Sequence, residues 1–186
     1  EVATALERLK PDIVLTVGDR YETLSTVIAA AYMNIPIAHT MGGEISGTID
    51  ESIRHAMSKF AHIHFPATEL SKQRLIRMGE DPNNIYVVGC PSIDVIRETP
   101  KVDIETLEEY FNLNFKKPIL LMIQHPVTTE AVDSFLQIKE TVDAIREVNV
   151  QTVALLPNND AGYSKIIDYI KQSDIKWYPS LPTEIF

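Results

Sequence analysis

The chain has 186 residues, and 45% of them are hydrophobic, which is enough for one large domain or two small domains with apolar cores. Its formal net charge of -9, without any basic run, argues against binding to nucleic acid or to an anionic membrane surface. No apolar run approaches the roughly 20 residues that a membrane-spanning helix needs. The single cysteine excludes an intrachain disulfide and favours a reducing compartment, the cytoplasm.

The first half of the chain opens with a helical pattern and then alternates between short apolar runs and further helical patterns. Continuous apolar strands joined by helices are typical of a parallel sheet that is covered on both faces. The expected strands are 13–17, 35–38, 62–66 and 85–88, and the expected helices between them are 23–33, 49–61 and 69–78.

The hydrophobic pattern lapses between Cys90 and Asp103 and then restarts. Prolines at positions 91 and 100 favour a linker or hinge in this stretch. We therefore predict a first domain at 1–92, a linker at 93–103 and a second domain at 104–186. The second domain is expected to contain helices 104–111, 131–148 and 163–172 and strands 119–123, 152–156 and 175–178.

The chain opens without a methionine and stops just after an expected strand. We therefore expect it to be a fragment of a longer protein, with both domains incomplete. Unpaired strand edges or exposed apolar surface are then expected where it is cut.

The stretch 39–55 brings several reactive groups together with three of the chain's seven glycines. Thr48 and Glu51 have the spacing of a capping box, which predicts that a helix begins at Ile49 with free N–H groups that attract an anion. The glycines let the backbone turn sharply and come close to a ligand, and they are Gly42, Gly43 and Gly47.

On the predicted helix, Asp50 and Arg54 lie four residues apart, at the edge of the apolar stripe. They could form an ordinary solvated surface pair, or they could line the wall of a cleft. Their position just after the glycine loop favours a functional role.

Polar residues follow several of the expected strands, at the edge where open parallel sheets bind their ligands. Asp19 suits general acid–base catalysis or the N-cap of the next helix, and Arg20 suits binding to phosphate. In the second half, the loop residue His125 suits proton transfer or a hydrogen bond to phosphate, because histidine is the side chain that commonly changes its charge near neutral pH. Asn158 follows the next strand. We expect a set of polar residues to approach one interdomain cleft, namely Arg20, Glu44, Asp50, His125 and Asn158. No spacing of histidine, cysteine and carboxylates resembles a metal site, and no cofactor is expected.

These motifs, in this order and spacing, resemble the UDP-N-acetylglucosamine 2-epimerase family, and specifically its hydrolysing branch. Each motif alone is weak, but the ordered set is specific and extends over nearly the whole chain. The matching motifs are Gly18-Asp19-Arg20, Gly42-Gly43-Glu44, Ser46-Gly47-Thr48-Ile49-Asp50, Ser52-Ile53-Arg54-His55, Gly89-Cys90-Pro91-Ser92, Gln124-His125-Pro126-Val127-Thr128-Thr129 and Pro157-Asn158.

The resemblance implies an α/β fold of two Rossmann-like domains with parallel sheets, similar to the GT-B fold of nucleotide-sugar glycosyltransferases, with a UDP-sugar between the domains. It implies that UDP-N-acetylglucosamine loses its C2 proton, eliminates UDP and adds water to give N-acetylmannosamine for sialic-acid-type synthesis. The full-length protein is expected to be a homo-oligomer, and the fragment by itself is expected to be inactive.

The resemblance also implies roles for individual residues. Asp19 and Asp50 match the acid–base carboxylates, and His125 matches a histidine near the diphosphate. Met41 stands where many relatives have an acidic residue, and Glu44 is the candidate to replace that residue. The residues that match nucleotide or substrate contacts are Arg20, Gly42, Gly43, Arg54 and Asn158.

Three other functions stay open from the sequence. Relatives that act on UDP-2,4-diacetamido-bacillosamine share most of these motifs, so the sugar is not determined. A UDP-sugar-binding protein without catalysis would release no UDP. A glycosyltransferase of the same fold would need an acceptor for turnover.

Overall fold

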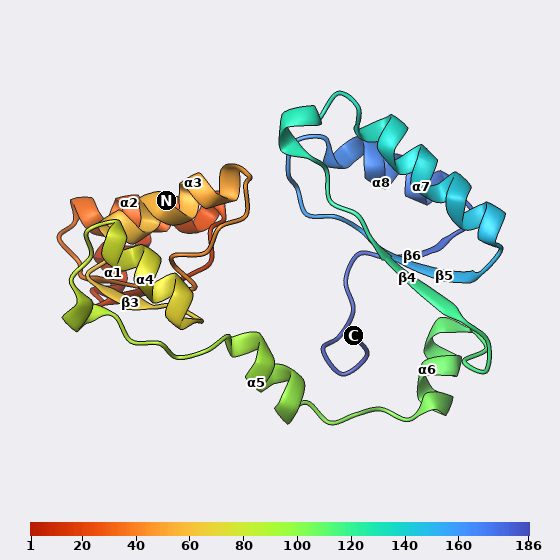
Figure 1. Ribbon diagram of the computed structural model, residues 1–186, viewed down its shortest axis with the longest axis horizontal. Helices are drawn as coiled ribbons and strands as arrows, with labels where there is room; N and C mark the ends of the chain where they lie inside the picture. The colour runs from red at the N-terminus through yellow and green to blue at the C-terminus, as the bar shows by residue number, and fades with distance from the viewer. The chain divides into compact units, whose positions relative to one another are not determined.

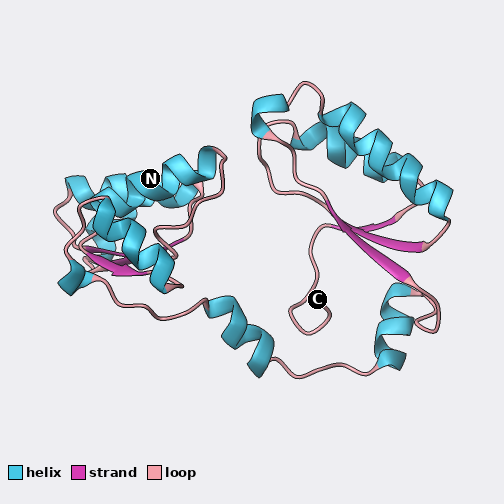
Figure 2. Ribbon diagram, viewed as in Figure 1, coloured by secondary structure: helices cyan, strands magenta, loops and turns pink.

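The computed structural model describes all 186 residues and divides into two compact units, Glu1–Arg97 and Glu98–Phe186 (Figure 1). Each unit contains a three-stranded parallel sheet with the helices that join its strands (Figure 2). None of the helices is both long enough and apolar enough to span a lipid bilayer. The predicted α/β class with parallel sheets is confirmed, whereas the bounds at 92 and 104 stay a prediction.

In the first unit, the strands lie side by side in chain order, and apolar side chains from the helices and strands form a single core. Burial of a Leu, Ile or Met side chain contributes about 1.5–3 kcal/mol, so this core fixes the sheet whose ends carry the candidate site. The core residues are Leu6, Val14, Val27, Ala30, Ile37 and Met57. The elements are α1 (Val2–Leu9), β1 (Val14–Val17), α2 (Tyr21–Tyr32), β2 (Ile37–Thr40), α3 (Ile49–Phe60), β3 (Ile63–Phe65), α4 (Glu69–Arg77) and the short 3-10 helix η1 (Pro82–Asn84).

The predicted strand 85–88 does not form, although this segment lies beside β3. The Tyr86 N–H donates to the His64 carbonyl at 2.9 Å, and the Val88 N–H donates to the Pro66 carbonyl at 3.2 Å. Only one bridge, at His64, results. A parallel ladder needs donors on both strands, and Pro66 has no N–H to donate in return. The proline therefore stops the pairing.

A helix that the sequence analysis did not predict, α5 (Pro91–Glu98), occupies part of the expected linker. A proline in the first helical position is compatible with a helix, because the N–H that it lacks would have no helical partner there. Pro100 then follows the helix end. The two prolines bound a helix here rather than marking irregular chain.

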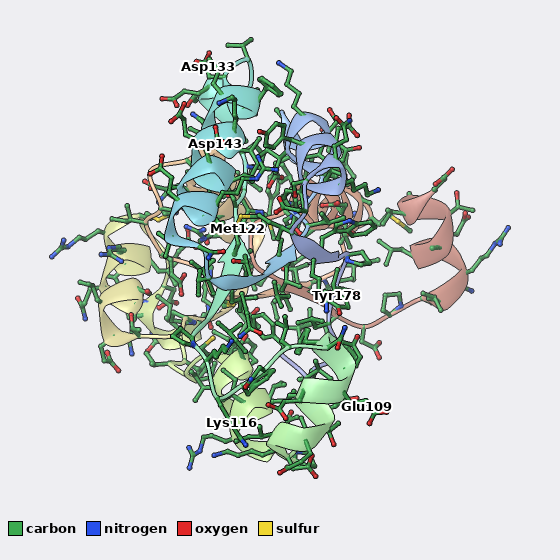
Figure 3. All side chains as sticks on the ribbon, turned by 90° about the vertical axis from the view of Figure 1, so that its right-hand side faces the viewer. Glu109, Lys116, Met122, Asp133, Asp143 and Tyr178 are labelled. Carbon is green, nitrogen blue, oxygen red and sulfur yellow. The ribbon has the colours of Figure 1, made fainter.

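The second unit repeats the arrangement, with strands β4, β5 and β6 side by side and a core of residues from β4, β5, α7 and α8. Figure 3 shows Asp133, just before α7, and Glu109, on α6, at opposite ends of this unit, with Met122 of β4 between them. The elements are α6 (Ile104–Phe111), β4 (Ile119–Ile123), the 3-10 helix η2 (Thr128–Glu130), α7 (Ser134–Val148), β5 (Gln151–Leu155), α8 (Tyr163–Gln172) and β6 (Lys176–Tyr178).

Both sheets expose apolar side chains, so the expectation that helices cover both faces is wrong for this chain. Leu15 and Val17 of β1 are 60% and 55% exposed, and Leu121 and Ile123 of β4 are 50% and 44% exposed. Both strands are edge strands with one neighbour each. Each sheet therefore has an unpaired edge strand that carries exposed apolar side chains.

Ser134, at the start of α7, has a fully buried hydroxyl with no hydrogen-bond partner. We expect Ser134→Ala to raise the free energy of unfolding by about 1 kcal/mol, because a buried hydroxyl without a partner is desolvated without compensation. Denaturant unfolding of the full-length protein measures this change. Ser173→Ala is the matched control, since the Ser173 hydroxyl donates to the Ile170 carbonyl and accepts from the Ile175 N–H. Ser173→Ala should lower the free energy of unfolding, because it removes both of these hydrogen bonds. A lower free energy of unfolding in Ser134→Ala would contradict the prediction.

Candidate active site

The carboxyl ends of β1 and β2 lie at one edge of the first sheet. The strands are parallel, and Val17 is the register partner of Thr40. Gly18 and Asp19 therefore leave the sheet beside Met41 and the glycine loop. This is the edge at which open parallel sheets bind ligands.

Asp19, just after β1, forms an ion pair with Arg54 of α3. This ion pair joins the carboxyl end of β1 to α3. The Arg54 side chain is only 7% exposed, and that of Asp19 is 23% exposed. A second guanidinium nitrogen of Arg54, Nη1, donates to the Glu44 carbonyl at 2.8 Å. Asp19 is not the N-cap of α2, because Arg20 takes that position. One buried cation thus fixes the first candidate carboxylate and the glycine loop together.

Of the two alternatives for Asp50 and Arg54, the surface ion pair does not form. Asp50 instead accepts a hydrogen bond from the Thr48 hydroxyl at 3.3 Å, at an exposed position. Arg54 is buried and turns towards Asp19 and the Glu44 carbonyl, where its charge has a counter-ion and its N–H groups have acceptors.

Neither hydrogen bond of the capping box predicted at Thr48 and Glu51 forms. The helix begins at Ile49 as expected, but the Thr48 side chain caps no N–H group. The Glu51 carboxylate reaches back and accepts from the Ser46 and Gly47 N–H groups at 2.9 and 2.7 Å. These two bonds stabilise the ionised form and lower the pKa of Glu51. These two loop N–H groups are thus bonded to a carboxylate of the chain itself.

Gly42 and Gly43 are buried against α3 and α4. A Cβ on Gly42 would lie 2.9 Å from the Ser58 hydroxyl oxygen, and one on Gly43 would lie 2.3 Å from the Ser71 carbonyl oxygen. We expected these glycines to allow a close approach to a ligand. The contacts show that the loop needs glycine here in order to pack against its own helices, and the approach to a ligand stays a prediction.

His39, to which the sequence analysis assigned no role, is completely buried at the carboxyl end of β2. Its Nε2 atom lies 2.8 Å from the Gly18 carbonyl oxygen, and its Nδ1 atom lies 3.3 Å from the Ser58 hydroxyl. Burial lowers the pKa of His39, although the bond to the Gly18 carbonyl opposes this shift. All four residues of β2 are buried, so a polar one among them must find partners. A histidine within a fully buried strand is the signal that could have identified His39.

Arg20 and Met41 also lie at this edge. Arg20 follows Asp19 directly; its Nε atom is 3.6 Å from Glu22, and its guanidinium lies 5.5 Å from the centre of the Tyr21 ring. Met41 is partly buried and has a left-handed backbone, with φ of 60°. Its N–H donates to the Phe65 carbonyl at 3.0 Å, which holds this conformation in place.

In the second unit, His125 and Asn158 follow β4 and β5. Ile123 and Leu155, the last residues of these strands, are register partners, so both loops leave the same carboxyl edge of the sheet. His125 and Asn158 are exposed. Both residues therefore lie at the carboxyl edge of this sheet, as predicted.

A sequence profile of the family described as UDP-N-acetylglucosamine 2-epimerase matches residues 1–186. The chain belongs to this epimerase family. A UDP-N,N'-diacetylbacillosamine 2-epimerase (hydrolyzing) of Legionella pneumophila is 42% identical over 170 residues, which are 89% of this chain and 45% of that protein. A UDP-N-acetylglucosamine 2-epimerase of Neisseria meningitidis is 34% identical over 183 residues, which are 97% of this chain and 48% of that protein.

The epimerase chain described here thus spans about half the length of the curated relatives that it matches. Its fold is similar to that of the Methanocaldococcus jannaschii UDP-GlcNAc 2-epimerase, solved in complex with UDP-GlcNAc and UDP, with a TM-score of 0.77 and 21% identity. That match covers 98% of this chain and 54% of the solved chain. The predicted likeness to the GT-B fold is confirmed.

Proposed function

We propose that the full-length protein is a hydrolysing 2-epimerase, which converts a UDP-linked 2-acetamido sugar to the free 2-epimer and UDP. The observation that carries this proposal is the position of Asp19. Its carboxylate lies at the carboxyl edge of a parallel sheet, is oriented by a buried arginine, and belongs to a chain of the epimerase family.

The proposed chemistry has two stages. A carboxylate takes the proton from C2 of the sugar, the electron pair forms a double bond between C1 and C2, and the bond from C1 to the UDP oxygen breaks. Water then adds its hydroxyl to C1, and C2 receives a proton on the opposite face. The C2 proton is weakly acidic, so its removal needs a base held in place, and the departing diphosphate needs nearby cations or donors.

We assign the proton transfers to Asp19 and Asp50, with Glu44 as the third candidate carboxylate. The carbonyl of Glu44 accepts from Arg54, which keeps this residue at the same edge as Asp19. We propose that Arg20 and Asn158 contact the nucleotide and that His125 assists at the diphosphate. We assign no nucleotide contact to Arg54, because its guanidinium is buried and bonded to Asp19 and Glu44.

Two sugars fit this chemistry. UDP-N-acetylglucosamine would give N-acetylmannosamine, whereas UDP-2,4-diacetamido-bacillosamine has a second acetamido group at C4. The 42% identity to the L. pneumophila protein, against 34% to the N. meningitidis protein, favours the second sugar. Met41 also favours it, because a partly buried thioether at this edge can pack against an acetamido methyl group but cannot transfer a proton.

Turnover in heavy water tests the proposal. The full-length protein, given each UDP-sugar without an acceptor, is expected to release UDP and to leave one deuterium at C2 of the free sugar, because the C2 proton exchanges with solvent between the two stages. Mass spectrometry and proton NMR of the product measure this. A binding protein would release no UDP, a glycosyltransferase would need an acceptor, and a product that keeps its original C2 hydrogen would exclude the elimination.

A further inference from the structure

Asp19 is held from two directions by buried groups. Arg54 binds its carboxylate, as described above. The backbone that carries it is held separately, because the carbonyl of the preceding residue, Gly18, lies 2.8 Å from Nε2 of His39. Gly18 has a φ of +75°, a conformation that side chains other than glycine rarely adopt. The turn that presents Asp19 therefore depends on glycine and on a fixed carbonyl.

The hydrogen-bond partners of His39 determine its tautomer. A carbonyl oxygen can only accept, so Nε2 must bear the hydrogen that it donates to Gly18. In the neutral ring, which burial favours, Nδ1 then carries no hydrogen. It lies 3.3 Å from the Ser58 hydroxyl oxygen, which donates its hydrogen to the Arg54 carbonyl. The titratable groups that face this ring are His64, Arg54 and Asp19.

Ser58 connects this histidine to the helix that carries Arg54. Its hydroxyl lies 3.0 Å from the Arg54 carbonyl, one turn earlier in α3, and both Ser58 and His39 are completely buried. Gly42 leaves no space for a side chain beside the two polar groups. The network thus joins the ends of β1 and β2 to α3 through two completely buried side chains.

We propose that His39 is a positioning residue for the reaction: its Nε2–H holds the Gly18 carbonyl and so sets the place of the Asp19 carboxylate, without itself touching the substrate. This inference rests on the proposed function, because it assumes that Asp19 transfers a proton. Misplacement of a reacting group by about 1 Å can lower a rate by about 100-fold.

Two amide substitutions separate the two ring nitrogens. In His39→Gln the side-chain amide nitrogen takes the place of Nε2 and can donate to Gly18, whereas in His39→Asn it takes the place of Nδ1 and cannot reach Gly18. In the full-length protein we expect His39→Asn to lower kcat about 10- to 100-fold, with KM changed less than about 3-fold, and His39→Gln to recover most of the lost kcat. The folded fraction of each variant is measured by denaturant unfolding, and kcat is expressed per folded protein.

Equal kcat values per folded protein for the two variants, or a loss of turnover that follows the folded fraction alone, would overturn the inference. If His39→Asn does not fold, Ser58→Ala replaces it, with a smaller expected loss of kcat because the donor to Gly18 stays. Absence of turnover by the wild type with every UDP-sugar would overturn the proposed function instead. Crystal structures of the variants would then decide the positioning: the Gly18 carbonyl and the Asp19 pair with Arg54 should move in His39→Asn and not in His39→Gln.

Discussion

Asp19→Asn in the full-length protein is expected to lower kcat by between about 100-fold and about 10,000-fold, the range that general acid–base groups contribute. Asparagine has nearly the shape of aspartate, and its side-chain oxygen can still accept from Arg54, but it cannot take a proton from C2. The dissociation constant for UDP should change less than about 3-fold, because we assign Asp19 to the sugar and not to the nucleotide. Steady-state kinetics and calorimetric titration with UDP measure the two quantities.

A loss of folded protein must be separated from this loss of catalysis. Arg54 is 6% exposed and would lose its counter-ion, which costs stability, although Asp19 is partly solvated and the lost pair is not fully buried. Unfolding curves therefore accompany the kinetics. Asp12→Asn is the matched control, since Asp12 is exposed and precedes β1, at the opposite end of that strand. Normal turnover by Asp19→Asn would refute our assignment of the base.

The sequence predicted where the helices and strands lie because hydrophobic periodicity reports burial directly. The helix 49–60, the strand 119–123 and the helix 163–172 all begin where the pattern predicted. The strand 85–88 failed for a reason outside its own residues, namely the missing N–H of Pro66 on its neighbour. Strand pairing is a property of two segments, and periodicity describes only one.

The candidate site shows the same limit more clearly. Spacing along one helix pairs Asp50 with Arg54, whereas the fold pairs Arg54 with Asp19, 35 residues earlier in the chain. Local spacing identifies the neighbours that a helix offers, but a buried arginine takes the partner that the tertiary structure brings to it. The residue types and their order therefore indicated which edge of the sheet carries the candidate site and which chemistry suits it. The contacts that orient each side chain could be found only from the three-dimensional structure.

Gly43→Ala is expected to lower the free energy of unfolding of the full-length protein by about 3 kcal/mol or more. Two costs add at this position. Gly43 has a φ of +79°, and the left-handed conformation costs about 1–2 kcal/mol for a residue with a Cβ. The new Cβ would also lie 2.3 Å from the Ser71 carbonyl oxygen and 3.1 Å from the side chain of Leu75, and forced overpacking costs about 1–3 kcal/mol.

Gly47→Ala separates these two costs, because Gly47 has a similar φ of +71° but no atom within 4 Å of the Cβ position. It should lose only the conformational part, about 1–2 kcal/mol. Its N–H still donates to Glu51, since alanine keeps that donor. Denaturant unfolding of both variants measures the difference, which reports the contact between the glycine loop and the start of α4. Equal decreases in the free energy of unfolding of the two variants would show that α4 accommodates the additional Cβ without an energetic cost. The packing role that we assign to Gly43 would then be wrong.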